Sequence, residues 1–266
     1  QKVHVSSCNV AASQMTTSNE SEDELQNLQA IFVIRNLAGG HAGNFTVEVH
    51  PDWAPLGAAR FNELLQARFF NGCRFFRVIS GFMAQFGLHG EPSVAAKWDQ
   101  RTIRDDTVLK KNTRGRVTFA TAGPGTRTTQ LFINFQDNSR LDSMGFAPFA
   151  EVIEGMDVVD RIYSGYGEGA PNGKGPSQAL LQSQGNRYLN RAFPHLSYIQ
   201  SVEIVGAGPF PPATPESLEP PAEVSSIGLS PMTTMFLIIL ALCAVGSALM
   251  ARILRPVFSR DKARDV

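Results

Sequence analysis

An arginine within a dense run of apolar and amide residues is the first candidate for chemistry. Residues 74–87 read RFFRVISGFMAQFG, and a second such run, residues 115–134, reads GRVTFATAGPGTRTTQLFIN. Strand alternation in the first run places Arg77 and Phe76 on opposite faces. A guanidinium in a dry groove is a strong hydrogen-bond donor, whereas the alternative is that Arg77 only extends its charged end to solvent.

Other kinds of site lack the residues that they need. The glycine-rich segment 165–175 is not a Walker phosphate loop, because Glu168 replaces its first glycine and Gly175 replaces the Ser or Thr that binds magnesium. We interpret this segment as a flexible surface loop. No serine lies in a nucleophile elbow. The histidines show no metal-ligand spacing, so neither a metal nor a cofactor is expected: His4, His41, His50, His89 and His195.

The overall charge also limits the function. The 266 residues include 24 Lys and Arg against 24 Asp and Glu, whereas nucleic-acid binding usually requires a clear basic excess. Nucleic acid is therefore not an expected partner. Hydrophobic residues make up 43% of the chain and charged residues 18%, which excludes a wholly disordered chain.

At the two apolar runs the sequence resembles the cyclophilins, which are peptidyl-prolyl cis-trans isomerases. The resemblance rests on the long motifs FRVIxGFMxQ and AGPxTxxxQxFI, and it extends over residues 28–205 through LDSMGFAPF at 141–149 and GMDVV at 155–159. It implies an isomerase, or rotamase, of protein folding. Such an enzyme acts on proline-containing segments of client proteins and needs no cofactor.

The resemblance also implies which residues form the site. By position, Arg77 matches the catalytic arginine of the family, and Gln85 and Phe82 complete the catalytic group. Further positions match the pocket that receives the proline ring and the groove that holds the peptide. These implied substrate-binding residues are Phe76, Met83, Ala120, Thr121, Gln130, Phe132 and Leu141.

The chemistry of bond rotation explains these residue types. The rotation faces a barrier of about 18–20 kcal/mol because the nitrogen lone pair is delocalised, and a guanidinium aimed at the prolyl nitrogen would stabilise the localised lone pair of the twisted bond. Phe76, Thr121 and Arg140 stand where the family commonly has histidine, asparagine and tryptophan. We therefore expect isomerase activity, reduced or with an altered peptide preference. The alternative is a catalytically weak or inactive binding or scaffold subunit of a membrane complex.

Strands must position these residues. Short apolar runs separated by glycines indicate a mainly β domain over residues 28–205. The resemblance implies a closed eight-stranded antiparallel barrel capped by two helices. The predicted strands cover residues 30–34, 45–49, 74–79, 82–86, 116–120, 131–135, 149–153 and 198–205.

Three helices are expected around this sheet. Pro55 and the helical spacing that follows it predict a helix to about Arg68, and a second helix begins near Met156. The segment 165–196 is longer than in compact cyclophilins, and we expect an additional helix there through Tyr188.

Four further segments flank the domain. Residues 1–27 are polar and then acidic, which predicts a disordered arm. Residues 206–231 contain seven prolines, which is typical of an extended stalk. Residues 232–251 carry no charge and have about the length that crosses a bilayer, so they predict a single-pass transmembrane helix in contact with lipid. Residues 252–266 form a basic tail.

The charges on either side of the predicted span indicate its orientation. The tail has five Lys and Arg against two Asp, whereas the nearest charges before the span are Glu216, Glu219 and Glu223. By the positive-inside rule the tail is cytosolic and the domain lies on the lumenal side, in the secretory pathway. The chain begins at Gln1, and this topology needs an upstream signal, so a cleaved signal peptide is expected. The alternative is a tail-anchored protein with a cytosolic domain.

Overall fold

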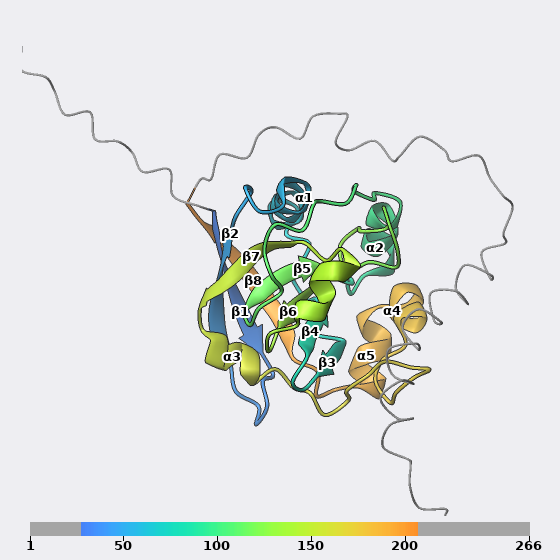
Figure 1. Ribbon diagram of the computed structural model, residues 1–266. Helices are drawn as coiled ribbons and strands as arrows, with labels where there is room; N and C mark the ends of the chain where they lie inside the picture. Colours follow the sequence, from blue (N-terminus) through green and yellow to red (C-terminus); the bar gives the residue numbers. More distant parts are fainter. Residues whose placement is uncertain (1–27, 207–266) are drawn as a thin grey trace, which may run out of the picture.

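The computed structural model describes residues 28–206, which fold around one curled β-sheet (Figure 1). Within these residues, no helix is long and apolar enough to cross a bilayer. The predicted arm 1–27, transmembrane helix 232–251 and basic tail 252–266 lie outside the described residues, as does the predicted stalk after Gly206.

Eight antiparallel strands form the sheet in the order β3-β4-β6-β5-β7-β2-β1-β8. Each predicted strand range overlaps one of them, because the alternation that defines a strand is local. The strands are β1 Gln29–Arg35, β2 Gly43–Val49, β3 Arg77–Ile79, β4 Met83–Phe86, β5 Arg116–Phe119, β6 Leu131–Asn134, β7 Pro148–Glu154 and β8 Tyr198–Val205.

The sheet is curled but not fully closed, so the prediction of a closed barrel holds only in part. Strand β3 itself does not pair with β8. The segment just before β3 does, through a bridge between Arg74 and Tyr198 and through hydrogen bonds from Phe75 N to Ser197 O at 3.0 Å and from Ile199 N to Cys73 O at 2.9 Å. Strand β3 contains only three residues, and the segment that contacts β8 is not continuous with it as a strand, so the ladder between the two edges is interrupted.

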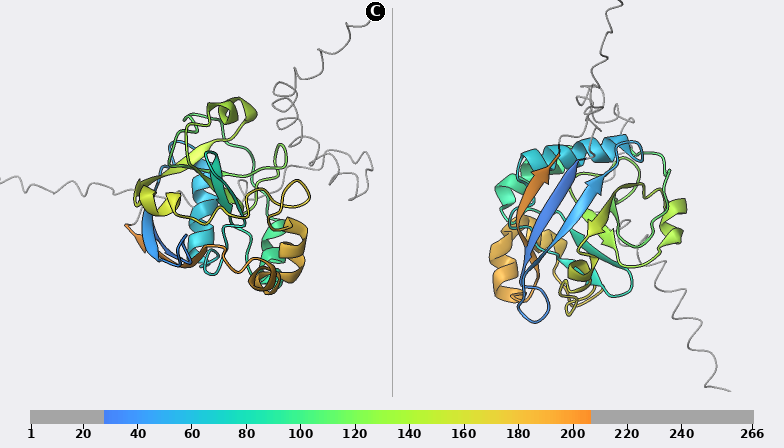
Figure 2. Two further views of the ribbon diagram at one scale, coloured as in Figure 1. Left: turned by 90° about the horizontal axis from the view of Figure 1, so that it is seen from below. Right: turned by 90° about the vertical axis from the view of Figure 1, so that its left-hand side faces the viewer.

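Helix α1, Pro55–Gln66, confirms the first predicted helix and runs across the top of the strands in the right-hand view of Figure 2. Proline at its first position favours helix initiation, because its fixed φ suits that position. Ala54 precedes the helix and has no side chain that could cap it. Asp106 supplies the cap from a distant loop, because its carboxylate accepts hydrogen bonds from Leu56 N at 3.0 Å and Gly57 N at 2.8 Å.

The described residues contain five α-helices, more than the two that cap the predicted barrel. Helix α3, Met156–Asp160, begins at the predicted residue, and the expected additional helix is a pair, α4 Gln178–Gln184 and α5 Asn186–Ala192. Helix α2, Pro92–Asp99, is not predicted, because it buries only two of its residues and shows little apolar periodicity. Helices α2, α4 and α5 lie together on one flank (Figures 1 and 2).

Two apolar clusters stabilise this arrangement. The main core lies inside the curl of the sheet and is rich in phenylalanine, with the rings of Phe32 and Phe45 stacked 5.0 Å apart. A second cluster joins the α4–α5 pair to the sheet edge. Its buried members are Phe76, Leu88, Leu181, Leu189 and Leu196.

Candidate active site

Three strands, β3, β4 and β6, bring predicted site residues together as cross-strand neighbours, and β5 adds Thr118. The register pairs Arg77 with Gln85, Gln85 with Phe132, and Phe132 with Thr118. Directly opposite residues in an antiparallel pair project from the same face of a sheet. Met83 lies two residues from Gln85 and therefore shares that face. A polar end and an apolar end thus form one continuous surface on the side away from the main core.

At the polar end, Arg77 and two glutamines form a chain of hydrogen bonds. Arg77 Nη1 donates to Gln85 Oε1 at 3.0 Å, and Gln85 Nε2 donates to Gln130 Oε1 at 2.9 Å. The Arg77 side chain is 18% exposed, and Gln85 is buried. Because little water surrounds the guanidinium, its hydrogen bonds are stronger there than in bulk solvent.

A carboxylate outside the predicted site contacts the same guanidinium. Arg77 Nε donates to Glu168 Oε1 at 2.5 Å, and Arg77 Nη2 donates to Glu168 Oε2 at 2.7 Å. Burial raises the pKa of Glu168, but Arg77 lowers it further, so the net pKa lies below the ordinary value. Glu168 belongs to the segment 165–175, which is a surface loop as predicted, and this contact ties the loop to β3. The two residues are 91 positions apart, and no local pattern signals their contact.

The apolar end is a compact cluster of predicted pocket residues. Met83, Phe132 and Leu141 are buried, and Phe82 and Ala120 are partly exposed and pack against them. A half-exposed phenylalanine next to a buried apolar floor gives an adjoining ring or alkyl group a surface on which to bind.

Phe146 also belongs to this cluster, although it is not among the predicted site residues. Its ring meets that of Phe132 edge to face at 5.7 Å. Asn112, which is fully buried, fixes this wall by donating from Nδ2 to Phe146 O and to Asp142 Oδ1, both at 2.8 Å. The available signal was the apolar position in the motif at 141–149.

Thr121 and Arg140, two of the residues that differ from the common family pattern, lie at the rim of the apolar cluster. Thr121 Oγ1 hydrogen-bonds to the carbonyl of Gly123 and accepts from Gly123 N at 3.0 Å, so it folds its own loop. The guanidinium carbon of Arg140 lies 4.6 Å from the centre of the Phe82 ring, in a cation–π contact. A cation therefore covers one face of this ring.

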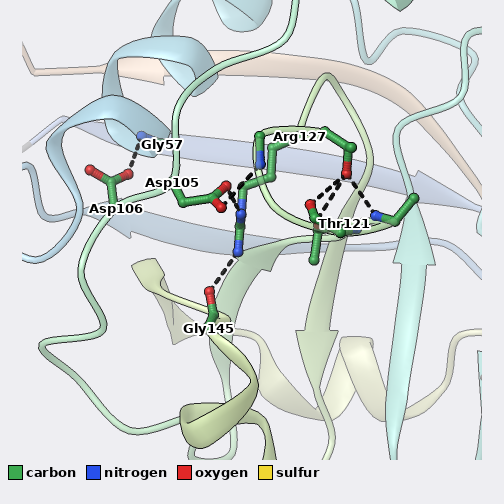
Figure 3. A network of polar contacts seen from close by, with 10 residues as sticks. Gly57, Asp105, Asp106, Thr121, Arg127 and Gly145 are labelled. Carbon is green, nitrogen blue, oxygen red and sulfur yellow. Dashed lines mark hydrogen bonds and ion pairs between the residues drawn. The ribbon is translucent and has the colours of Figure 1, made fainter. Parts of the chain in front are cut away.

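A buried arginine, Arg127, connects the loop that carries Thr121 to the segments that carry Asp105 and Gly145, as Figure 3 shows. Arg127 is 5% exposed, pairs with Asp105 and donates from Nη2 to Gly145 O at 2.5 Å. Gly125 N donates to the other oxygen of Asp105 at 3.0 Å. Three separate segments of the chain are thereby held around the apolar end.

Phe76 does not join the other predicted substrate-binding residues. It is 1% exposed and packs in the second cluster against leucines of α4 and α5. Phe76 lies just before β3 and belongs neither to the main core nor to the cluster of Met83, Phe132 and Leu141. The structure therefore separates Phe76 from the other predicted substrate-binding residues and packs it against the α4–α5 pair.

The arrangement offers a planar, partly polar group a charged end and an apolar end. Within residues 28–206, no group of three or more His, Cys, Asp or Glu side chains could hold a metal ion. A group lying across the surface would meet charged N–H donors at one end and apolar rings at the other. Such a surface can polarise an amide nitrogen or oxygen while it binds the adjoining ring.

Comparisons with known proteins give this surface a family context. The family model described as cyclophilin type peptidyl-prolyl cis-trans isomerase/CLD matches residues 34–178, more than half of the 266 residues. The chain is similar to peptidyl-prolyl cis-trans isomerase B of Escherichia coli, at 37% identity over 129 residues, which are 45% of this chain and 78% of that protein.

Two further matches are weaker in coverage or in sequence. A peptidyl-prolyl cis-trans isomerase of Acinetobacter baylyi is 38% identical over 126 residues, which are 45% of this chain and 66% of that protein, just under two thirds of its length. A crystal structure of a Cryptosporidium parvum cyclophilin type peptidyl-prolyl cis-trans isomerase aligns with a TM-score of 0.48 and 17% identity, covering 68% of this chain and 99% of that one.

Proposed function

The chain belongs to the cyclophilin-type peptidyl-prolyl cis-trans isomerases, and we propose that its isomerase site is the surface around Arg77 and the apolar cluster beside it. The predicted enzyme class is confirmed by the family match and by the relatives. The observation that supports the site is the juxtaposition of a shielded guanidinium with an apolar cluster on one face of the sheet.

In this proposal Arg77 is the catalytic residue. No covalent bond breaks during rotation, so the barrier falls if the twisted amide is bound more tightly than the planar one. Twisting localises the lone pair on the prolyl nitrogen, and a guanidinium N–H can donate to that lone pair. Gln85 supports the donor by accepting from Arg77 Nη1. Each tenfold acceleration requires about 1.4 kcal/mol of such preferential binding.

The apolar cluster binds the proline ring while the acyl side of the bond turns. Met83, Phe132 and Leu141 form its floor and Phe82 its half-exposed wall. The groove beyond them, at Ala120, Thr121 and Gln130, would hold the peptide backbone, and clients are proline-containing segments of proteins. Binding the ring in both the planar and the twisted state lowers KM, whereas Arg77 acts on kcat.

The variant Arg77→Ala tests this assignment. We expect kcat/KM for an X-Pro peptide to fall about 100-fold, as when one transition-state donor is removed from other enzymes. The matched control is Arg114→Ala, because Arg114 also pairs bidentately with a carboxylate, that of Asp160, but lies outside the surface described here. Turnover by Arg77→Ala equal to that of the wild-type chain would refute the catalytic role of Arg77.

We further propose that the enzyme works at a membrane surface, anchored by residues 232–251, with its domain on the lumenal side. The support is the uncharged run of about 20 residues and the basic tail that follows it. Protease added to sealed vesicles should leave the domain intact until detergent is added. Digestion of the domain without detergent would contradict the lumenal orientation and favour a tail-anchored protein.

A binding subunit of a membrane complex is the second candidate function. The observation that favours it is the ion pair between Arg77 and Glu168, since a guanidinium already paired with a carboxylate has less charge to offer. The isomerase assay on the wild-type chain distinguishes the candidates, because a pure binding module gives no acceleration over the uncatalysed rate.

A further inference from the structure

We propose that Glu168 is a positioning residue for catalysis, holding the Arg77 guanidinium in one orientation against the groove. This inference rests on the proposed function, in which Arg77 is the catalytic residue. It assigns a role to the glycine-rich segment 165–175, which neither the family motifs nor the pocket residues include.

Arg77 and Glu168 form a bidentate ion pair, and a third hydrogen bond joins the guanidinium to Gln85. The two carboxylate oxygens of Glu168 accept from Nε and Nη2 of Arg77, at 2.5 and 2.7 Å, while Gln85 accepts from Nη1 at 3.0 Å. A guanidinium has five N–H donors, so these contacts engage three of them and leave one on each terminal nitrogen. A planar guanidinium that is hydrogen-bonded along two edges is held in one orientation, although the side chain that carries it is long and flexible.

The loop is built to present this carboxylate. Gly169 N donates to Glu168 Oε1, and Gly175 N donates to the main-chain carbonyl of Glu168, both at 2.8 Å. A Cβ atom at Gly173 would lie 2.2 Å from that carbonyl oxygen, and one at Gly175 would lie 2.8 Å from it. Only glycine permits such close approach. The glycines that suggest a phosphate loop therefore fold the chain tightly around Glu168.

The second apolar cluster fixes both partners of the ion pair. Phe76, which directly precedes Arg77, is buried in this cluster. Tyr166, two residues before Glu168, packs against the same cluster and meets Phe193 edge to face at 4.9 Å. Phe76, which stands where the family commonly has histidine, thus belongs to the cluster that holds the Glu168 loop in place.

An inhibitory counter-ion is the competing role for Glu168, and it predicts the opposite effect on turnover. If the carboxylate mainly neutralised the guanidinium, its removal would raise kcat. The ordered loop favours positioning, because a carboxylate gripped by its own backbone and by two guanidinium nitrogens adds preorganisation. Removing it leaves Arg77 free to adopt orientations that do not reach the prolyl nitrogen.

The test compares kcat and KM of the full chain for an X-Pro peptide in the wild type, Glu168→Gln, Glu168→Ala, Arg77→Ala and the double variant of both alanines. We expect Glu168→Ala to lower kcat about tenfold with KM within about twofold, equivalent to about 1.4 kcal/mol. Glu168→Gln keeps one acceptor and should lose less. The double variant should match Arg77→Ala, because residues that act as a unit are not additive.

A structural role would not reproduce that pattern. The Nε–H resonance of Arg77 should be protected from solvent exchange in the wild type and lose that protection in Glu168→Ala. The matched control is Asp160→Asn, which breaks the bidentate pair with Arg114 and should leave kcat unchanged. If Glu168→Ala does not fold, the isosteric Glu168→Gln still measures the loss.

The outcomes separate this inference from the proposed function. If Arg77→Ala is inactive and both Glu168 variants turn over as fast as the wild type or faster, the positioning role is overturned and the proposed site stands. If Arg77→Ala is as active as the wild type, the proposed site fails, and the positioning role fails with it.

Discussion

The Glu168 carboxylate is the titratable group paired with the Arg77 guanidinium. Glu168 has a pKa below its ordinary value, because Arg77 and Gly169 N–H outweigh the effect of burial. An acid whose pKa is lowered by folding contributes stability above its ordinary pKa, and this contribution is lost as the pH falls through the folded value. Arg77 is the charged side chain that acts on Glu168, so this titration reports on the pair.

The pH profile of kcat should therefore differ between the wild type and Glu168→Gln. We expect wild-type kcat to stay level from neutral pH down to the ordinary glutamate range and to fall only below it, when Glu168 takes up a proton and releases Arg77. Glu168→Gln should start lower and lack this acidic fall. Exchange spectroscopy of an X-Pro peptide measures both profiles, with circular dichroism at each pH as the control for folding. An identical acidic fall in both proteins would assign it to another group.

The wall of the pocket gives a prediction about KM. Phe82 is half-buried, so truncation should remove a surface for the proline ring with little loss of packing in the main core. We expect Phe82→Ala to raise KM about tenfold and to change kcat less, because the ring binds the planar and twisted states alike. Steady-state kinetics and thermal melting measure these effects.

Arg140 provides the control for this prediction. Its side chain is exposed and its guanidinium lies over the Phe82 ring, so Arg140→Gln removes the cation and leaves the ring in place. We expect a change in KM below about threefold, since an exposed cation–π contact contributes about 0.5–1 kcal/mol. If Arg140→Gln raised KM as much as Phe82→Ala, the guanidinium rather than the ring would form the wall.

The α4–α5 pair is the element that separates this chain from a simple capped sheet. It docks through one buried leucine of each helix, Leu181 in α4 and Leu189 in α5, and Leu189 is 0% exposed within the second cluster. Replacing Leu189 with alanine leaves a cavity there, and we expect a loss of about 2–5 kcal/mol in the free energy of unfolding. Because this pair flanks the Glu168 loop, kcat should fall in the direction expected for Glu168→Ala.

Leu180 offers a matched control in α4, because it is 41% exposed. Denaturant unfolding should show Leu180→Ala within about 0.5 kcal/mol of the wild type, as is usual for surface positions. Equal losses in Leu180→Ala and Leu189→Ala would contradict the docking of the pair through its buried leucines.

Elements defined by local pattern could be predicted, whereas contacts between distant segments could not. Alternation located β8 at its observed bounds, and Pro55 marked the start of α1. The motif around Arg77 could supply Gln85, because the two are adjacent across a short hairpin. No pattern within a few residues could reveal that Glu168 contacts Arg77, or that Phe76 packs against helices more than 100 positions later. Both contacts depend on how the segment 165–196 packs against the sheet.

At the scale of the whole molecule, Arg127 connects loops that the sheet alone does not hold. Its guanidinium pairs with Asp105 and donates to Gly145 O (Figure 3). Its carbonyl accepts from Ile103 N at 2.9 Å. Arg127 therefore joins three parts of the chain. These are the loop that carries Thr121, the segment that caps α1 and the end of the 3-10 helix Ser139–Met144. The apolar end of the site depends on all three.

Removing the contacts of Arg127 should lower stability and activity together. Breaking a buried ion pair leaves polar groups without partners, so we expect Arg127→Ala to lower the free energy of unfolding by about 3 kcal/mol. The exposed pair of Arg161 and Asp157 is the control, and Arg161→Ala should cost less than about 1 kcal/mol. Denaturant unfolding measures both, and kcat/KM should fall only in Arg127→Ala, because its loops border the pocket. Equal destabilisation by the two variants, or unchanged turnover in Arg127→Ala, would mean that the groove keeps its shape without this connection.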